Sequence, residues 1–208
     1  MNKNMKRLFF VLFASMALAF GASAQTAEEI VARMDKETEK GDTQGLAMTM
    51  SMKIPIVGEF STRIKARGDY SKAESTVKGE KVIFWSDNKT TWTYTANNNE
   101  LVIEPSKGSQ NDEGELVKGI TSGYDVSIKG ETADAWQIKC VKQKSNQDKD
   151  DPKTMDLVVS KKTYLPVRLL AKVKMVTVTL SNFALGVSPE EVKFDQSAYK
   201  DAKVIDKR

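Results

Sequence analysis

Alternation between apolar and other side chains over residues 46–56 is the feature that most constrains the fold of this chain. The apolar residues at every second position are Leu46, Met48, Met50, Met52, Ile54 and Ile56. Because successive side chains of a strand point to opposite faces, the pattern predicts a half-buried strand with all six on one face. Three are methionines, whose flexible side chains suit a surface that accepts varied apolar ligands. An ordinary sheet core is the alternative interpretation.

Strand signals continue along the rest of the chain at short intervals. Further strands are predicted at residues 60–66, 82–85, 91–95, 101–103, 124–128, 136–141, 155–159, 165–173 and 175–180. One helix is expected between Thr26, which forms a capping box with Glu29, and Gly41. A second, short helix is expected near residues 113–120. About ten strands with few helices predict a mainly β fold, in which an antiparallel sheet curls toward a barrel.

The first 24 residues have the pattern of a secretory signal peptide. A basic stretch up to Arg7 precedes an apolar run over residues 8–20, and a small-x-small cleavage site ends at Ala24. The run is too short to span a bilayer, which needs about 20 apolar residues. We therefore expect a soluble, exported chain that begins at Gln25 and forms one domain over residues 25–208. No cysteine follows the cleavage site, so no lipid anchor is expected, and the periplasm is the predicted location.

Composition excludes several classes of function. The chain has no histidine, which rules out Ser-His-Asp catalysis and histidine metal ligands. The single cysteine, Cys140, cannot form an internal disulfide, and its alternation with Trp136 and Ile138 predicts a buried small hydrophobe. The signal segment holds three basic residues and no acidic one, so its removal brings the net charge from +4 to +1. Without a basic stripe, nucleic acid is not an expected partner. Neither catalysis nor a metal or cofactor site is predicted.

Three segments, in order along the chain, resemble the periplasmic outer-membrane lipoprotein carrier family, LolA. The first, residues 64–70, ends a strand in a basic residue shortly before an aromatic one. The second, residues 86–94, reads Ser-Asp-Asn-Lys-Thr-Thr-Trp-Thr-Tyr. The third, residues 163–168, is followed by C-terminal strands, by Phe194 and by a final Val-Ile-Asp over residues 204–206.

The sequence departs from the family pattern at three positions. Gly68 stands where the family usually has proline, and Asn88 replaces a turn glycine. The asparagine is tolerable because it also adopts positive φ. Val192 replaces the first aromatic residue of the closing pair. These changes indicate a divergent branch, in which the cargo can differ.

The resemblance implies an incomplete antiparallel barrel, or half-barrel, with an apolar concave face covered by short helices. Family members carry acylated lipoproteins from an inner-membrane lipoprotein-releasing transporter to an outer-membrane acceptor. The residues expected to line such a cavity are Met48, Met50, Met52, Ile64, Trp92, Tyr94 and Trp136. Arg67 matches the family arginine that holds a lid closed, although a solvated charge at the end of a strand is an equal interpretation. Residues 108–121 are the expected lid helices.

Two other functions fit the same sequence. One is a general carrier of free lipid or another amphiphile, and the other is a sensor of mislocalised lipoproteins. Sensors on this half-barrel usually have an additional domain, for which the 184 residues after the signal leave no room. The outer-membrane acceptor itself carries a lipidated cysteine where this chain has Gln25. We therefore expect a monomeric shuttle whose partners are acylated lipoproteins, the transporter and the acceptor.

Overall fold

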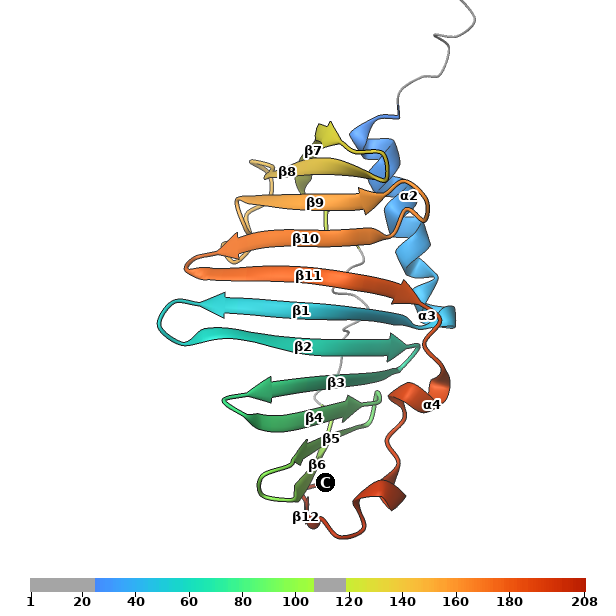
Figure 1. Cartoon of the computed structure of the whole chain (residues 1–208), viewed down its shortest axis with the longest axis vertical. Helices are drawn as coiled ribbons and strands as arrows, with labels where there is room; N and C mark the ends of the chain where they lie inside the picture. The colour runs from blue at the N-terminus through green and yellow to red at the C-terminus, as the bar shows by residue number, and fades with distance from the viewer. Residues whose placement is uncertain (1–24, 107–118) are drawn as a thin grey trace, which may run out of the picture.

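One open sheet dominates the structure, a computed structural model that describes residues 25–106 and 119–208 (Figure 1). Its strands are β1 (Leu46–Ile54), β2 (Gly58–Arg67), β3 (Tyr70–Val77), β4 (Glu80–Ser86), β5 (Thr90–Thr95), β6 (Glu100–Pro105), β7 (Tyr124–Glu131), β8 (Ala135–Lys142), β9 (Thr154–Ser160), β10 (Pro166–Val173), β11 (Val176–Leu185) and β12 (Lys203–Asp206). The helices are α2 (Ala27–Glu39), α3 (Gly41–Gln44), α4 (Pro189–Val192) and the 3₁₀ turn η2 (Gln196–Tyr199). None of these helices has the length and apolar character needed to cross a membrane.

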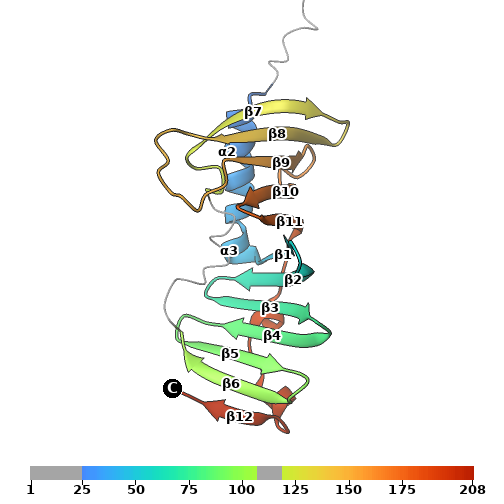
Figure 2. The same cartoon turned by 90° about the vertical axis from the view of Figure 1, so that its left-hand side faces the viewer.

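The strand order shows why the sheet stays open. It runs β12-β6-β5-β4-β3-β2-β1-β11-β10-β9-β8-β7, and the end strands β12 and β7 do not pair with each other. All neighbours are antiparallel except β12 and β6, which are parallel. Figure 2 shows the strands stacked along the long axis, with α2 beside the β7–β11 end. The prediction of an incomplete antiparallel half-barrel with short helices is confirmed.

The pairing of β1 with β11 joins the two halves of the sheet. Met50 lies opposite Thr62 of β2 on one side and Leu180 of β11 on the other. The face of the sheet that carries the β1 methionines is called the inner face below. Side chains of residues that lie directly opposite each other on antiparallel strands are on the same face of the sheet. The register therefore extends the inner face across both halves.

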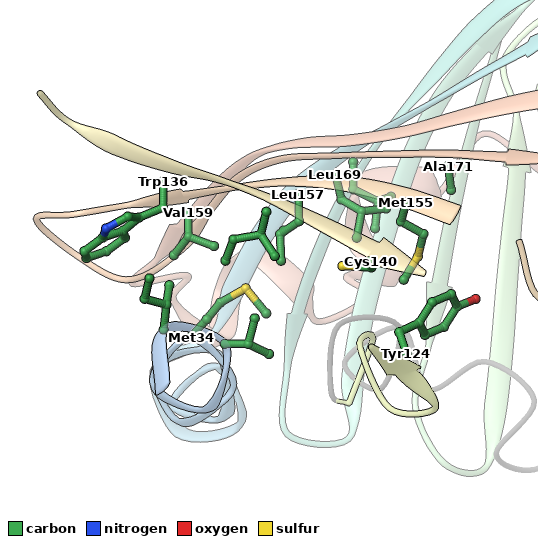
Figure 3. Packing of buried hydrophobic residues seen from close by; sticks show 13 residues of the cluster. Met34, Tyr124, Trp136, Cys140, Met155, Leu157, Val159, Leu169 and Ala171 are labelled. Atoms are coloured by element: carbon green, nitrogen blue, oxygen red, sulfur yellow. The ribbon is translucent and has the colours of Figure 1, made fainter. Parts of the chain in front are cut away.

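Helix α2 covers the inner face of β7–β11. Its N-terminus is the capping box predicted from Thr26 and Glu29: the Thr26 hydroxyl accepts from the Glu29 N–H, and the Glu29 carboxylate accepts from the Thr26 N–H. One helix turn apart, Ile30 and Met34 are fully buried against strand side chains (Figure 3). The strand residues of this cluster are Tyr124, Trp136, Ile138, Cys140, Met155, Leu157, Val159, Leu169, Ala171 and Leu180. Cys140 is buried among them, as predicted.

The C-terminal segment packs on the opposite face, called the outer face below. After β11 the chain crosses β2 and β3 through α4 and then continues to η2. Phe194 stacks on Trp92 with ring centroids 5.0 Å apart and meets Trp85 edge-on at 5.3 Å. The segment ends as β12, which adds to the edge of β6. It thereby gives the β4–β6 half a second apolar layer.

Several elements differ from the sequence predictions. Strand β3 was not predicted because its inner-face residues, Ser71, Ala73 and Ser75, are small and give no apolar alternation. Strand β12 is short and forms by pairing with a distant strand. β1 ends at Ile54, and Ile56 lies in the following turn instead of on the shared face. The signal segment and most of the expected lid, residues 108–121, lie outside the described residues.

Candidate binding surface

The inner face opens progressively along β1. Met48 is only 2 % exposed near α3, whereas Met50 and Met52 are partly buried, and Ile56 in the turn beyond is fully exposed. The same gradient appears on β11, where Leu180 is buried and Val178 is partly exposed. The inner face is therefore closed at the α3 end and accessible at the β1–β2 turn.

Four partly buried apolar side chains lie together at the accessible end. In the strand register Met52 is opposite Phe60 of β2 and Val178 of β11, and Met50 is the next inner-face residue of β1. We call Met50, Met52, Phe60 and Val178 the methionine surface. Flexible thioethers beside an aromatic and a β-branched residue form a deformable apolar wall. Such a wall can contact a hydrocarbon chain without requiring one fixed ligand shape.

Five of the seven predicted cavity residues face inward, and they fall into three groups. Met50 and Met52 belong to the methionine surface, while Met48 and Ile64 pair across β1 and β2 and form a small buried cluster with Leu46. Trp136 also faces inward, but it is 9 % exposed because it lies in the cluster beneath α2. Its ring lies 5.2 Å from that of Tyr164.

Trp92 and Tyr94 are not brought to the inner face. They alternate along β5 with threonines, and the register places Trp92 opposite Trp85 of β4, on the outer face. There the Tyr94 ring lies 4.7 Å from the ring of Tyr199 in η2. The aromatic residues point outward because the C-terminal segment covers that face. Burial of these large rings against Phe194 and Tyr199 then stabilises the arrangement.

Arg67 holds the start of the C-terminal segment. Its Nη1 donates to the Val187 carbonyl at 2.8 Å. At the same junction the Gly186 N–H donates to the Gly45 carbonyl at 3.0 Å. The role of Arg67 as a lid latch remains a prediction, because the expected lid lies almost entirely outside the described residues. The described contact instead links β2 to the chain leaving β11.

Replacing Arg67 with leucine should loosen this junction. Loss of a partly buried hydrogen bond from a charged donor should lower the free energy of unfolding by about 1–2 kcal/mol. In limited proteolysis, cleavage within residues 187–202 should become faster. Arg63→Leu is the matched control, because Arg63 is exposed on the same face of the same strand. Equal stability and protease resistance of the two variants would contradict the anchoring role.

Helix α2 carries an unfavourable carboxylate. Burial raises the pKa of Asp35 from 3.8 to about 6, and the nearby Glu39 carboxylate adds to the rise. Among the described residues, no donor reaches the buried Oδ1 of Asp35. Because the folded-state pKa exceeds the unfolded value, stability is lost as pH rises from about 4 to about 6, and the penalty persists above that range.

We therefore expect Asp35→Asn to be stabilising at pH 7. The gain should be about 1 kcal/mol, since the group is only partly buried and solvent screens its charge. It should nearly vanish near pH 3, below both pKa values, where the wild-type carboxyl is mostly protonated in both states. Thermal melts at the two pH values test this, with the exposed Asp134→Asn as the control. A gain of equal size at both pH values would contradict the assignment.

Three partly buried, inward-facing residues around the β1 methionines were not among the predicted cavity residues: Phe60, Val178 and Phe183. Phe60 and Val178 follow the alternation of their strands, so periodicity could have placed them in the candidate wall. Phe183 could not be placed in this way, because a bulge opposite Met48 shifts the phase of β11. Asn182 at the bulge has φ 57°, and the inner face therefore includes both Leu180 and Phe183.

Comparisons with known proteins find solved structures of similar fold but no close relative in sequence. No protein-family model matches the chain, and no curated protein matches it. Two solved structures align with 80% of this chain: LprF from Mycobacterium bovis, over 97% of its own length at 12% identity and TM-score 0.52, and lipoprotein LppX from Mycobacterium tuberculosis, over 98% at 14% and 0.51. These identities show a shared fold alone.

A LolA superfamily protein from Nitrosomonas europaea also aligns, over 84% of this chain and 100% of that one. Its identity is 12% and its TM-score is 0.33, which is too low to define a shared fold. The open twelve-stranded sheet, together with the likeness to LprF and LppX, supports the LolA-like fold that the resemblance implies.

Proposed function

We propose that this chain, with its LolA-like fold, is a periplasmic carrier that shields the acyl chains of lipoproteins and hands them to an outer-membrane acceptor. The observation that carries the proposal is the methionine surface at the accessible end of the inner face. Each CH₂ removed from water contributes about 0.8 kcal/mol, so acyl chains need an apolar surface while they cross an aqueous compartment. A deformable wall provides that surface without a rigid pocket that would oppose release.

The division of the inner face suggests how cargo would be accommodated. The β7–β11 half is filled by α2, whereas the methionine surface lies partly exposed beside it. A first acyl chain would contact Met50, Met52, Phe60 and Val178. Further chains would need α2 to move away from its cluster. Uptake from an inner-membrane transporter and delivery to an acceptor complete the proposed cycle.

Identification of bound material tests this proposal. The chain is expressed with its own N-terminal segment in a bacterium with two membranes, purified without detergent and examined by mass spectrometry. Co-purified acylated lipoproteins, released by detergent, are the expected result. Free fatty acid or phospholipid alone would favour a general amphiphile carrier. Protein without any acylated material would contradict the carrier function.

A further inference from the structure

The three most exposed large apolar side chains of the described residues lie together at one end of the sheet. Ile56 is fully exposed and Val57 is 63 % exposed in the β1–β2 turn, and Met175 is 73 % exposed in the β10–β11 turn. The two turns are neighbours because β1 pairs with β11 up to Lys53 and Thr177, as seen at the left of Figure 1. We call Ile56, Val57 and Met175 the apolar tip.

The backbone at the apolar tip is strained. Ile56 has φ 72°, and the Val57 N–H donates to the Pro55 carbonyl at 2.8 Å across it. A β-branched residue is unfavourable at positive φ, where glycine has no such cost. The fold gains little from this side chain, since it is fully exposed. Backbone strain that no packing contact offsets indicates that the side chain serves contact with another molecule.

Two lysines flank the apolar tip, and an acidic residue lies beside each of them. Residues 53–58 and 173–176 contain Lys53 and Lys174 and no acidic residue. Lys53 lies opposite Glu59 in the register, and the Lys174 ammonium is 2.9 Å from the Asp150 carboxylate. Both side chains of that ion pair are largely exposed, so the pair is weak and a phosphate can replace the carboxylate.

The apolar tip also continues into the methionine surface. Along β1 the inner-face residue that follows Met52 is Ile54, directly before the turn, and Val176 and Val178 make the same connection on β11. All of these side chains are partly exposed. A membrane that received the tip would therefore lie at the mouth of the inner face.

We propose that the apolar tip inserts into an anionic lipid membrane, so that the inner face opens directly onto the bilayer. The choice of a bilayer follows from shape and charge: the tip is a short projection with lysines beside its apolar side chains. Interfacial anchors have this arrangement, with apolar groups about 5–10 Å deep at the boundary between headgroups and acyl chains. Lysine stems extend along the apolar region while their ammonium groups reach the phosphates. This inference extends the proposed carrier function to the site of exchange.

Flotation with protein-free vesicles tests the docking. Ligand-free protein is mixed with phosphatidylcholine vesicles that do or do not contain phosphatidylglycerol. Binding to the anionic vesicles is expected, and the double variant Ile56→Ser with Met175→Ser should bind about a hundredfold more weakly. The matched control, Ile128→Ser with Val167→Ser, removes two exposed apolar side chains elsewhere on the sheet and should bind normally. All variants keep the same net charge.

A single substitution separates strain from docking. Ile56→Gly should raise the melting temperature by about 2–4 °C, because it removes the positive-φ cost, and should weaken vesicle binding about tenfold. The docking proposal is overturned if the wild-type protein does not float, or if the tip variants float as well as the control pair. Binding to native membranes but not to vesicles would likewise overturn it in favour of a protein partner.

Failure of the carrier proposal would look different. Binding of a fluorescent acyl probe, measured without vesicles, should be the same in the tip variants and the wild-type protein. A chain that floats with vesicles but never binds the probe would keep the docking inference and overturn the carrier function. A chain that binds the probe without floating would keep the carrier function and overturn the docking inference.

Discussion

Met50→Asp should weaken binding of a fluorescent acyl probe at least a hundredfold. Met50 is in the middle of the inner face, packs against both core clusters, and lies next to Met52 on the methionine surface. An acyl chain bound there would remove water from the new carboxylate without supplying a hydrogen bond. That desolvation costs several kcal/mol, and about 2.8 kcal/mol is sufficient for a hundredfold loss. Titration of purified, delipidated protein with the probe measures the effect.

Two further variants separate binding from folding. Ser51→Asp places the same charge one residue later on β1, where the side chain faces outward, and should retain binding. Met50→Leu conserves volume and apolar character and should bind nearly as the wild type does. Melting temperatures are recorded for all three. A folded Met50→Asp protein with unchanged affinity would remove Met50 from the proposed binding surface.

Gly45→Ala should lower the free energy of unfolding by about 2–5 kcal/mol, the largest effect expected from an added methyl group at any glycine in the described residues. Gly45 has φ 79° and ψ 141°, a region that residues with a side chain rarely adopt. An added Cβ would lie 2.5 Å from the Val187 carbonyl oxygen and 2.7 Å from its Cβ. The chain leaving β11 would have to move away from α3, and the Arg67 contact with Val187 would be disturbed.

Gly79→Ala provides the control for this prediction. Gly79 has a similar φ of 82°, but nothing lies within 4 Å of an added Cβ. Only the conformational cost should remain, about 1–2 kcal/mol. Urea unfolding of the two variants measures the difference. Equal losses of stability would show that the close approach of Val187 to Gly45 does not matter.

Local rules in the sequence predicted most of the sheet. Alternation placed β1, β2 and the strands from β7 to β11 close to their observed ranges, and the Thr26–Glu29 box marked the start of α2. The exceptions have physical causes. β3 presents small residues such as Ser71 and Ser75 to the inner face, and β12 depends on a partner about a hundred residues away. The phase change at Asn182 depends on pairing with β1.

The candidate surface was only partly predictable, because alternation within a strand does not show which of its two faces points inward. Met50 and Met52 could be identified because their alternation defines one face of a strand. The same alternation in β5 could not say whether Trp92 and Tyr94 or the threonines between them face inward. Burial of Met48 and Trp136 likewise depends on what packs above them, which the pattern of one strand does not contain.

The sequence by itself determined a mainly β chain with a capped N-terminal helix and a methionine-rich strand face. It also excluded histidine-based chemistry. Tertiary structure alone decided which face of each strand is covered, since a period of two defines two faces but not their neighbours. α2 covers the β7–β11 half of the inner face, and the C-terminal segment covers the outer face near β5. The methionine surface borders the cluster beneath α2, and its side chains stay partly exposed.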